Sequence, residues 1–294
     1  MGPLVIQSWN CFGAAQSAMS FFRWRGVPDA HRLAHPSVRA TVNEVDILCM
    51  QEVFLGETEA FFDELPHTHK TRDDNRTVLW PLTVGGSGLG LASRLPIVAR
   101  SLRPFSRPHV GSERFARKGV LHARVLVGDE PRLEMDVVTT HLQSGLGSSA
   151  ASVRARQLAE LRSLVDAVGS DERPFVLCGD LNICGLSQSR VAGEYQRIRD
   201  VLSDFDDLGG DDDLPTFHPD PEVNALCHRF EGHGPRQRLD YMLFRPGRHR
   251  ALAPERCELV LTSKLEGHGP PTWASDHFAL RAVFGRSPPP ARSP

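Results

Sequence analysis

Residues that bind metal ions or activate water recur at the ends of short β-like runs in this chain. They are Asn10 after residues 4–9, Glu52 after 47–51, His141 after 136–140, Asp180 and Asn182 after 175–178, Asp240 before 241–244, and Asp276 with His277 before 278–284. If the strands that end in such a residue run antiparallel to the strands that begin with one, all of these side chains meet at one sheet edge. The pattern therefore predicts an active site at that edge.

The oxygen-bearing members of this set favour a hard divalent cation. Glu52, Asn10 and Asp276 are the ligands we expect, because carboxylate and amide oxygens suit Mg²⁺, Mn²⁺ or Ca²⁺ far better than zinc. Mg²⁺ commonly takes one or two protein carboxylates and completes its shell with water and a phosphate oxygen. The sequence thus predicts hydrolysis of a phosphodiester or a phosphomonoester.

The remaining members of the set supply the other parts of such a reaction. His277 titrates near neutral pH and is the predicted general base. Asp240 would accept a hydrogen bond from the second ring nitrogen and fix the tautomer. His141 and Asn182 would donate to the non-bridging phosphate oxygens, where negative charge builds up during the reaction. Asp180 completes the predicted catalytic set.

Each of these residues also has an ordinary structural explanation. A single Asp or Asn after a strand is more often a turn former or a helix cap than a ligand, and a single His is usually a surface or core residue. The joint pattern favours function, above all the segment 179–182 directly after one apolar run and 275–277 directly before another.

The elements that must position these residues form an α/β pattern with mixed sheets. Apolar residues recur at helical spacing over 149–168 and 35–45, and more weakly over 191–205. Runs at 88–93, 97–104, 120–127 and 133–140 follow one another without a helix, which predicts antiparallel hairpins. Because the polar strand ends are spread from Asn10 to His277, we expect one domain over residues 1–285, followed by a disordered Pro-rich tail at 286–294.

The composition excludes few functions but narrows the setting. A formal net charge of −2 gives no basic field for non-specific nucleic-acid binding, so nucleic acid is unsupported rather than excluded. Six cysteines without a Cys-x-x-Cys pair fit a reduced compartment. No secretory signal and no apolar stretch of about 20 residues is visible. We expect a soluble cytoplasmic monomer.

The polar strand ends also resemble a known series of motifs. In order they read Trp9-Asn10, Gln51-Glu52, Ser93 to Ile97, Thr140 to Leu142, Gly179 to Asn182, Leu239 to Tyr241 and Ser275 to His277. This series resembles the endonuclease/exonuclease/phosphatase superfamily. The resemblance implies a deoxyribonuclease I-like four-layer α/β sandwich, with two packed sheets flanked by helices. It also implies a divalent metal held chiefly by Glu52, and His277 as the base paired with Asp240.

Segments between the motifs resemble the neutral sphingomyelinase branch. They are Lys118 to Val120, Gln51 to Phe54 and Thr140 to Gln143. That branch implies a Mg²⁺-dependent phosphodiesterase, with Mn²⁺ or Co²⁺ as substitutes, which releases a phosphorylated headgroup from a phospholipid. Lys118, Asn182 and His141 would then contact the substrate. A DNA or RNA nuclease with the same residues remains an alternative, as does a non-enzymatic binding module.

A short aromatic and basic segment offers a possible membrane contact. Residues 19–25 interleave Phe21, Phe22 and Trp24 with arginines, which could enter a lipid interface while the arginines meet headgroup phosphates. The alternative is a short helix packed into the core. The chain lacks the aromatic hairpin that secreted bacterial sphingomyelinases carry before the final Asp-His, and has only the segment 267–273 there.

Overall fold

The computed structural model describes most of the chain. The described residues are 2–13, 31–54, 56–74, 77–79, 82–84, 86–106, 109–111, 113, 117–129, 132–186, 193–210, 214–267 and 271–286. The predicted membrane-contacting residues Phe21, Phe22 and Trp24 lie outside these ranges, as do positions 287–294 of the predicted tail. Arg286, the first residue of that tail, is instead the last residue of a strand.

Two mixed β-sheets form the centre of the fold. The first has the order β13 (Leu252–Val260), β14 (Ala279–Arg286), β1 (Leu4–Asn10), β2 (Ile47–Gln51), β6 (Gly90–Ser93) and β3 (His69–Arg72). The second has the order β11 (Asp206–Asp207), β12 (Asp240–Arg245), β10 (Phe175–Asp180), β9 (Leu133–His141), β8 (Gly119–Gly128) and β7 (Ile97–Pro104). A separate hairpin joins β4 (Thr77–Leu79) to β5 (Leu82–Val84).

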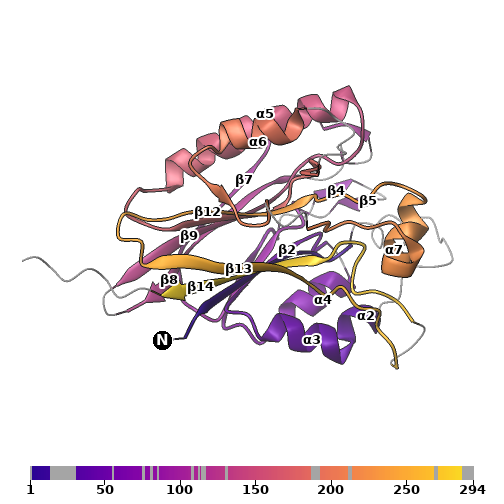
Figure 1. Cartoon of the computed structure of the whole chain (residues 1–294), viewed down its shortest axis with the longest axis horizontal. Helices are drawn as coiled ribbons and strands as arrows, with labels where there is room; N and C mark the ends of the chain where they lie inside the picture. Colours follow the sequence, from indigo (N-terminus) through magenta and orange to yellow (C-terminus); the bar gives the residue numbers. More distant parts are fainter. Residues whose placement is uncertain are drawn as a thin grey trace, which may run out of the picture.

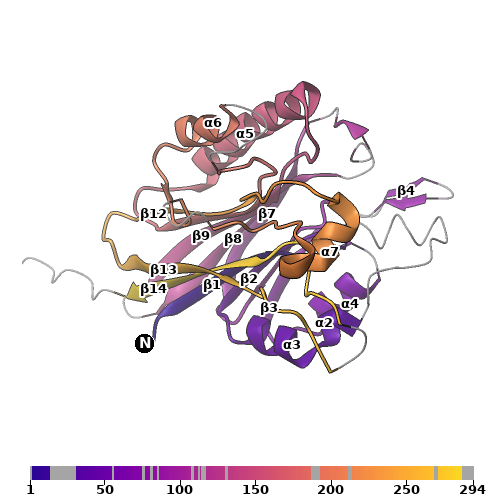
Figure 2. The same cartoon turned by 45° about the vertical axis from the view of Figure 1, so that its right-hand side comes forward.

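Helices cover the outer faces of both sheets, giving four layers (Figure 1). The helices α5 (Ser148–Val168) and α6 (Glu194–Val201) pack on the second sheet, where Leu158, Leu161 and Ile198 meet Leu177 in one apolar cluster. The helices α2 (His31–Ala34), α3 (Pro36–Asn43) and α4 (Glu57–Asp63) lie against the first sheet. The helix α7 (Pro221–Glu231) lies at one end of the sandwich (Figure 2). None of the helices in the described ranges has the length and apolar composition needed to cross a membrane.

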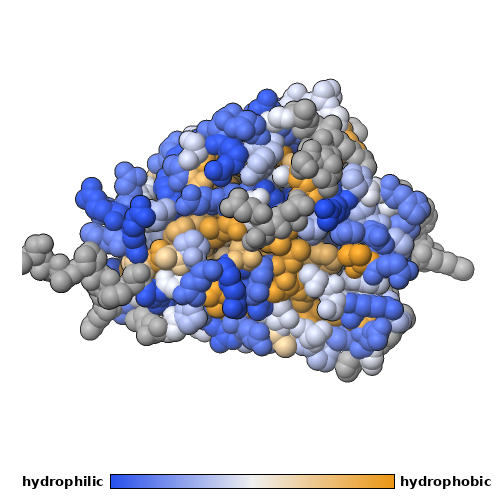
Figure 3. All heavy atoms as spheres, in the orientation of Figure 1, coloured by the Kyte–Doolittle hydropathy of each residue, from blue (hydrophilic) through white to orange (hydrophobic). Residues whose placement is uncertain are grey.

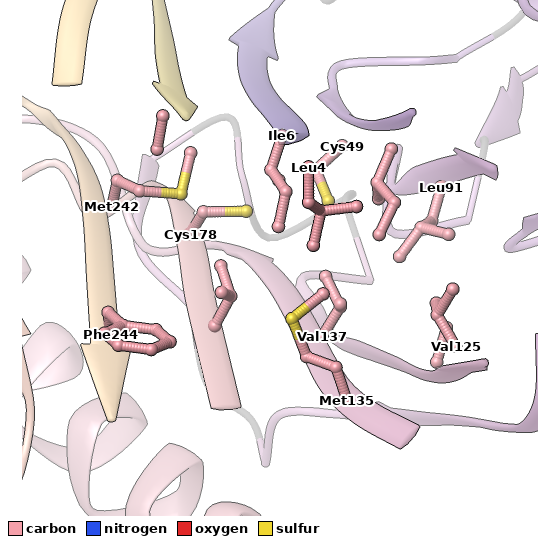
Figure 4. Packing of buried hydrophobic residues seen from close by; sticks show 14 of the residues in the cluster. Leu4, Ile6, Cys49, Leu91, Val125, Met135, Val137, Cys178, Met242 and Phe244 are labelled. Carbon is pink, nitrogen blue, oxygen red and sulfur yellow. The ribbon is translucent and has the colours of Figure 1, made fainter. Parts of the chain in front are cut away.

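The main core lies between the two sheets. Leu4, Ile6, Cys49 and Leu91 of the first sheet face Val125, Met135, Val137, Cys178, Met242 and Phe244 of the second (Figure 4). Side chains alternate along each strand, so the inward Leu121 and Ala123 of β8 flank His122, which points to the outer face. Full burial of one such Leu or Phe side chain contributes about 1.5–3 kcal/mol. The two sheets therefore form one rigid support.

The strand directions agree with the predicted orientation. β1 runs parallel to β2, and β9 runs parallel to β10. β14 and β12 run antiparallel to β1 and β10, respectively. In register, Asp180 at the end of β10 pairs with His141 of β9 on one side and with Asp240 of β12 on the other. The carboxyl ends of β1, β2, β9 and β10 and the amino ends of β12 and β14 therefore meet at one edge.

The helix and hairpin predictions are confirmed with one correction. The segments 149–168 and 35–45 form α5 and α3, and the weaker segment 191–205 contains the shorter α6. β7, β8 and β9 are joined as antiparallel hairpins. β6 and β7 do not form a hairpin, because β6 pairs with β2 and β3 while β7 belongs to the other sheet. The Ser93 hydroxyl bonds to the Leu95 carbonyl at 2.7 Å in a tight turn, where the chain leaves the first sheet for the second.

Candidate active site

A buried His–Asp pair lies where β12 begins and β14 is about to begin. His277 Nδ1 lies 2.8 Å from Asp240 Oδ2, and both side chains are almost fully buried. The backbone amides of Leu239 and Asp240 both donate to Thr216 Oγ1 at 3.1 Å, which fixes the start of β12. Because Nδ1 is bound to Asp240, Nε2 is the ring nitrogen that is left for proton transfer.

Asp180 contacts several other residues of the candidate site. Its Oδ2 accepts from Asn10 Nδ2 at 3.1 Å and lies 3.3 Å from His141 Nε2 and 3.8 Å from His277 Nε2. Its Oδ1 accepts from the backbone amide of Asn182 at 2.8 Å. One carboxylate thus contacts residues from β1, β9, the loop after β10 and the segment before β14.

Glu52 joins this group through Asn10. The Asn10 side-chain nitrogen donates to Glu52 Oε1 at 3.3 Å as well as to Asp180, and its oxygen accepts from the Phe12 amide at 3.1 Å. Glu52 itself has a φ of 63°, so the chain turns sharply at the end of β2. Glu52 and His277 consequently lie on the same edge of the sandwich, connected through Asn10 and Asp180. Asn10 turns its nitrogen toward the carboxylates, and its role as a metal ligand stays a prediction.

Asp276 is held by its neighbours rather than by a strand. The Ser275 hydroxyl lies 2.7 Å from the Asn10 carbonyl oxygen and 3.1 Å from Asp276 Oδ1. The Asn224 side chain of α7 donates to the backbone carbonyls of Ser275 and Asp276 at 3.0 and 3.3 Å. The segment that carries Asp276 and His277 is therefore tied to both β1 and α7.

Lys118 and Asn182 converge on one backbone carbonyl beside His141. Lys118 Nζ and Asn182 Nδ2 donate to the Leu142 carbonyl at 2.6 and 3.1 Å. Lys118 also pairs with Glu113 Oε1 at 2.6 Å, and its side chain is 3% exposed. The positive charge of Lys118 acts on both His141 and Asp180. These residues lie where sequence placed them, but their contact with a substrate stays a prediction.

The buried charges give the two histidines opposite protonation preferences. Burial disfavours the charged ring of His277, but the carboxylates of Asp240 and Asp180 outweigh it and hold the pKa of His277 well above its usual value. Burial, with the positive charges of Lys118 and His277, holds the pKa of His141 well below its usual value. His141 is therefore a neutral donor or acceptor at pH 7, and His277 is the stronger proton acceptor.

The carboxylates of the site fit a divalent cation. Burial raises the pKa of Asp180 to about 7 against the opposing charge of His277, and the pKa of Asp276 also rises to about 7, with Glu52 contributing to that rise. Burial is the main cause of both shifts, because it disfavours the charged form of a carboxyl group. The donors near Glu52 and Asp276 are oxygens, as Mg²⁺ prefers.

Asp180, Asp240 and His277 form a second possible group of ligands. One ligand atom of each lies within 4.8 Å of the others. His277 Nδ1 and Asp240 Oδ2 are already hydrogen-bonded to each other, so we interpret these two residues as a proton-transfer pair rather than as ligands.

Several residues that shape the site carry no sequence signal. Thr216, Phe217 and Asn224 lie between the motifs, where the sequence pattern does not mark them. The Phe217 ring centroid is 5.0 Å from that of His277, and its backbone bridges to both Gln237 and His277. Contacts of this kind join distant segments, and no local pattern in the sequence marks them.

One cavity among the described residues lies away from the candidate site. A cavity of about 630 Å³ is lined by Tyr195, Asp207 and Cys257 among others, and none of the predicted site residues lines it. Apolar residues form a band across the face that contains β12 and β13 (Figure 3). The candidate site residues instead lie at the end of the sandwich.

Known proteins resemble this chain in sequence profile and in fold. The Endonuclease/Exonuclease/phosphatase family matches residues 8–277. No curated protein matches the chain by sequence. The structure of sphingomyelinase C from Streptomyces griseocarneus is 20% identical, with a TM-score of 0.70, and the alignment covers 96% of this chain and 99% of that chain.

Two further structures extend the comparison. A mutant beta toxin from Staphylococcus aureus with bound magnesium ions is 16% identical, with a TM-score of 0.72 and coverage of 96% of this chain and 99% of that one. TDP2 from D. rerio, complexed with a single strand DNA product, is 15% identical, with a TM-score of 0.72 and coverage of 97% and 100%. At these identities the likeness shows a shared fold. Together with the family match over residues 8–277, it shows that the chain belongs to the endonuclease/exonuclease/phosphatase family.

Proposed function

We propose that this chain is a Mg²⁺-dependent phosphodiesterase of the sphingomyelinase type. It would hydrolyse a phospholipid by in-line attack of water on phosphorus and release the phosphorylated headgroup. The observation that carries the proposal is the pairing of His277 with Asp240 at 2.8 Å, directly beside the shared carboxylate Asp180. A base with a fixed tautomer beside a group of oxygen ligands is what metal-assisted phosphoester hydrolysis requires.

In this mechanism each residue has one task. His277 Nε2 accepts the proton of the attacking water while Asp240 stabilises the imidazolium that results. The new bond forms between the water oxygen and phosphorus, the bond from phosphorus to the lipid oxygen breaks, and the departing lipid alkoxide takes a proton from solvent. His141 and Asn182 donate to the phosphate oxygens as charge develops, with Lys118 adding positive charge nearby. Asp180 keeps Asn10 and His141 in place.

The metal would be held at the other side of the same edge. Glu52 is the principal ligand that we propose, with Asp276 and Asn10 beside it. When bound, Mg²⁺ would polarise a phosphate oxygen and offset the charge of the carboxylates. Support comes from the cluster of Glu52, Asn10 and Asp180 at this edge and from the magnesium ions in the beta toxin structure. Mn²⁺ and Co²⁺ are the substitutes that we expect.

The first test separates metal binding from proton transfer. We expect His277→Ala to abolish hydrolysis, because the variant lacks the imidazole that Asp240 orients to accept the proton of water, while Mg²⁺ affinity stays near wild type. Glu52→Gln should lose Mg²⁺ binding and activity together. Isothermal titration calorimetry measures the affinity, and release of phosphocholine from sphingomyelin in mixed micelles measures the activity. Equal losses of Mg²⁺ affinity in both variants would contradict these roles.

A lipid substrate is supported by an exposed leucine in the loop that follows His141. Leu146 is 59% exposed. The loop around it is firmly held, because Arg154 donates to the carbonyls of Gln143 and Gly145 at 3.0 and 2.8 Å. A rigid apolar residue close to the catalytic edge suits contact with a lipid interface.

The second test uses this leucine. Leu146→Ser should lower the rate on sphingomyelin vesicles several-fold but leave the rate on a soluble phosphodiester unchanged, because only the vesicle presents an apolar interface. Val98→Ser is the matched control. Val98 is also exposed, at 43%, but it lies in β7 at the end far from His141. Equal rates on vesicles for wild type and Leu146→Ser would argue against this contact.

A nuclease is the second candidate, supported by the fold likeness to TDP2 with its DNA product. A nuclease should lose affinity steeply with added salt, because binding releases counterions from the phosphate backbone. Rates on sphingomyelin, phosphatidylcholine, a lysolipid, single-stranded DNA, duplex DNA and an abasic duplex would decide between the two. No hydrolysis of any phosphoester with Mg²⁺, Mn²⁺ or Co²⁺ would instead favour a binding module.

We further propose that residues 1–285 act as one domain and that the protein works as a cytoplasmic monomer. The family match over 8–277 and the site built from both ends of the chain support one domain. Analytical ultracentrifugation would test the monomer.

A further inference from the structure

An arginine that is fully buried lies behind the candidate metal site. Arg32, in the short helix α2, has 0% of its surface exposed. Its guanidinium donates to two backbone carbonyl oxygens, that of Phe12 at 2.9 Å and that of Ala274. Both acceptors are distant in sequence, and both lie within two residues of a candidate metal ligand. Arg32 therefore connects two segments of the active site to a third part of the chain.

The Phe12 contact supports Asn10. Phe12 has a φ of 57°, a conformation that residues other than glycine rarely adopt and that tertiary contacts must hold. Its amide donates to the side-chain oxygen of Asn10, while the side-chain nitrogen of Asn10 donates to Glu52 and Asp180. The guanidinium also lies 5.8 Å from the centroid of the Phe12 ring. Arg32 thus holds the turn that orients the Asn10 side chain.

The Ala274 contact supports Asp276 and His277. Ala274 immediately precedes Ser275, whose hydroxyl contacts the Asn10 carbonyl and Asp276 Oδ1 and accepts from the His277 amide. One planar guanidinium therefore fixes both the segment after β1 and the segment before β14. A lysine could not replace it fully, because its ammonium lacks the fork of donors that reaches two carbonyls at once.

The charge of Arg32 also suits this position. Its hydrogen-bond partners among the described residues are neutral carbonyls, and burying a cation without a bonded carboxylate is costly. The negative charges of Asp276 and Glu52 act on the guanidinium through space.

A purely structural tie between helix and loop is the simpler alternative for Arg32. It predicts that loss of Arg32 lowers the free energy of unfolding and leaves metal affinity and kcat unchanged.

We propose that Arg32 is a positioning residue of the active site, which fixes Asn10 and Asp276 for metal binding by clamping the carbonyls of Phe12 and Ala274. For its effect on turnover the proposal rests on the proposed function. For its effect on metal binding it does not, because cation affinity is measured without a substrate.

The experiment compares Arg32→Lys with a matched control. Arg32→Lys keeps the positive charge and loses the fork, and Arg32→Gln is a second variant in case the lysine form does not fold. The control is Arg173→Lys, because Arg173 bonds to the buried Asp136 at the opposite end of β9 from His141. Circular dichroism and thermal melts establish the folded fraction. Calorimetry with Mn²⁺ gives the affinity, and hydrolysis of bis(p-nitrophenyl) phosphate gives kcat and KM per folded protein.

We expect Arg32→Lys to weaken Mn²⁺ binding and to lower kcat by about 10- to 100-fold each, as loss of a residue that orients metal ligands commonly does. KM should change little, and Arg173→Lys should resemble wild type in both measurements. A folded Arg32 variant with wild-type Mn²⁺ affinity and kcat would overturn the proposal. If wild type binds Mn²⁺ but hydrolyses nothing, the proposed function fails, and the Mn²⁺ affinities still decide the role of Arg32.

Discussion

At the scale of single residues, the environment of His277 decides what it can do. An ordinary histidine is half protonated near pH 6.5. Here the carboxylates of Asp240 and Asp180 overcome the cost of burying a charged ring, and the pKa of His277 is raised. The sequence identified His277, Asp240 and Asp180 as candidates, because each stands at the end of an apolar run. The pairing of Asp240 with His277 was predicted as well, but only the structure showed that Asp240 lies at Nδ1 and that Asp180 lies near Nε2.

This environment predicts a pH effect for Asp240→Asn. The Asp240 carboxylate raises the pKa of His277, so its removal should lower that pKa and move the acidic limb of the profile of kcat/KM to lower pH. The rate on the plateau should also fall, on the order of 100-fold or more, because the imidazolium loses its partner. The measurement is kcat/KM from pH 5 to 9. Asp206→Asn, at an exposed carboxylate of β11, is the control and should keep the wild-type profile. An acidic limb that stays in place or moves upward would contradict this assignment.

At the scale of elements, strand pairing brings the residues together. β9 and β10 are parallel, so their carboxyl ends deliver His141 and Asp180 side by side, and antiparallel β12 brings Asp240 to the same row. The runs 4–9, 47–51 and 175–178 in the sequence predicted these strands within one or two residues, because buried strands are strongly apolar. β13 was not predicted, because its residues 253–256 are exposed and include charged side chains, as is common at a sheet edge. The assignment of β6 and β7 to different sheets was also not predicted, because a short connection is compatible with either arrangement.

The close pairing of β9 and β10 depends on Gly179. Its φ is 138°, and a Cβ atom at this position would lie 2.0 Å from the carbonyl oxygen of Thr140. We therefore expect Gly179→Ala to lower the free energy of unfolding by about 1–3 kcal/mol and to reduce activity, because the neighbouring Asp180 must shift with the strand. Urea unfolding and kcat measure the two effects. The control is Gly209→Ala, where the added atom would lie at ordinary contact distances from its described neighbours, 3.7 Å from Leu214 and 3.8 Å from Arg238. Wild-type stability and activity in Gly179→Ala would show that the strands can separate without cost.

At the scale of the whole molecule, the two ends of the sandwich have different tasks. One end carries the residues that we propose to be catalytic. At the other end of β9, the fully buried Asp136 accepts from His122, Arg124 and Arg173 at 2.8, 2.9 and 2.7 Å. Arg124 and Arg173 also donate to the Val168 carbonyl at the end of α5, so the network joins the helix to the sheet. We expect this end to contribute to stability and not to catalysis.

The network predicts how stability depends on pH. Burial alone would raise the pKa of Asp136, but hydrogen bonds from His122, Arg173 and Arg124 outweigh it and lower the pKa below its usual value. Because the pKa is lower in the folded state than in the unfolded one, the stabilisation is complete above the unfolded pKa of about 3.9 and is lost as the pH falls through the folded pKa. Asp136→Asn should therefore cost about 3–5 kcal/mol at pH 7 and should flatten the loss of stability below about pH 4. Urea unfolding from pH 3 to 7 measures both effects.

An exposed acid provides the control for this prediction. Asp166 pairs with Arg162 one helical turn away, and its side chain is 58% exposed. Asp166→Asn should change the free energy of unfolding by about 0.5 kcal/mol or less, because solvent screens such pairs. The kcat of folded Asp136→Asn should stay near wild type. If Asp136→Asn and Asp166→Asn lowered the free energy of unfolding by similar amounts, burial of the Asp136 network would not explain its contribution to stability.

The sequence alone predicted the kinds of residue in the site, their places at strand ends and the relative directions of the strands that carry them. It could do so because burial leaves a periodic apolar pattern, and polar interruptions of that pattern are local features of the chain. Only the tertiary structure decided which atoms meet: Asn10 bridging Glu52 and Asp180, Thr216 holding the start of β12, and Arg32 clamping Phe12 and Ala274. These contacts join segments far apart in the chain, and their geometry follows from the packing of two sheets and not from any neighbouring sequence.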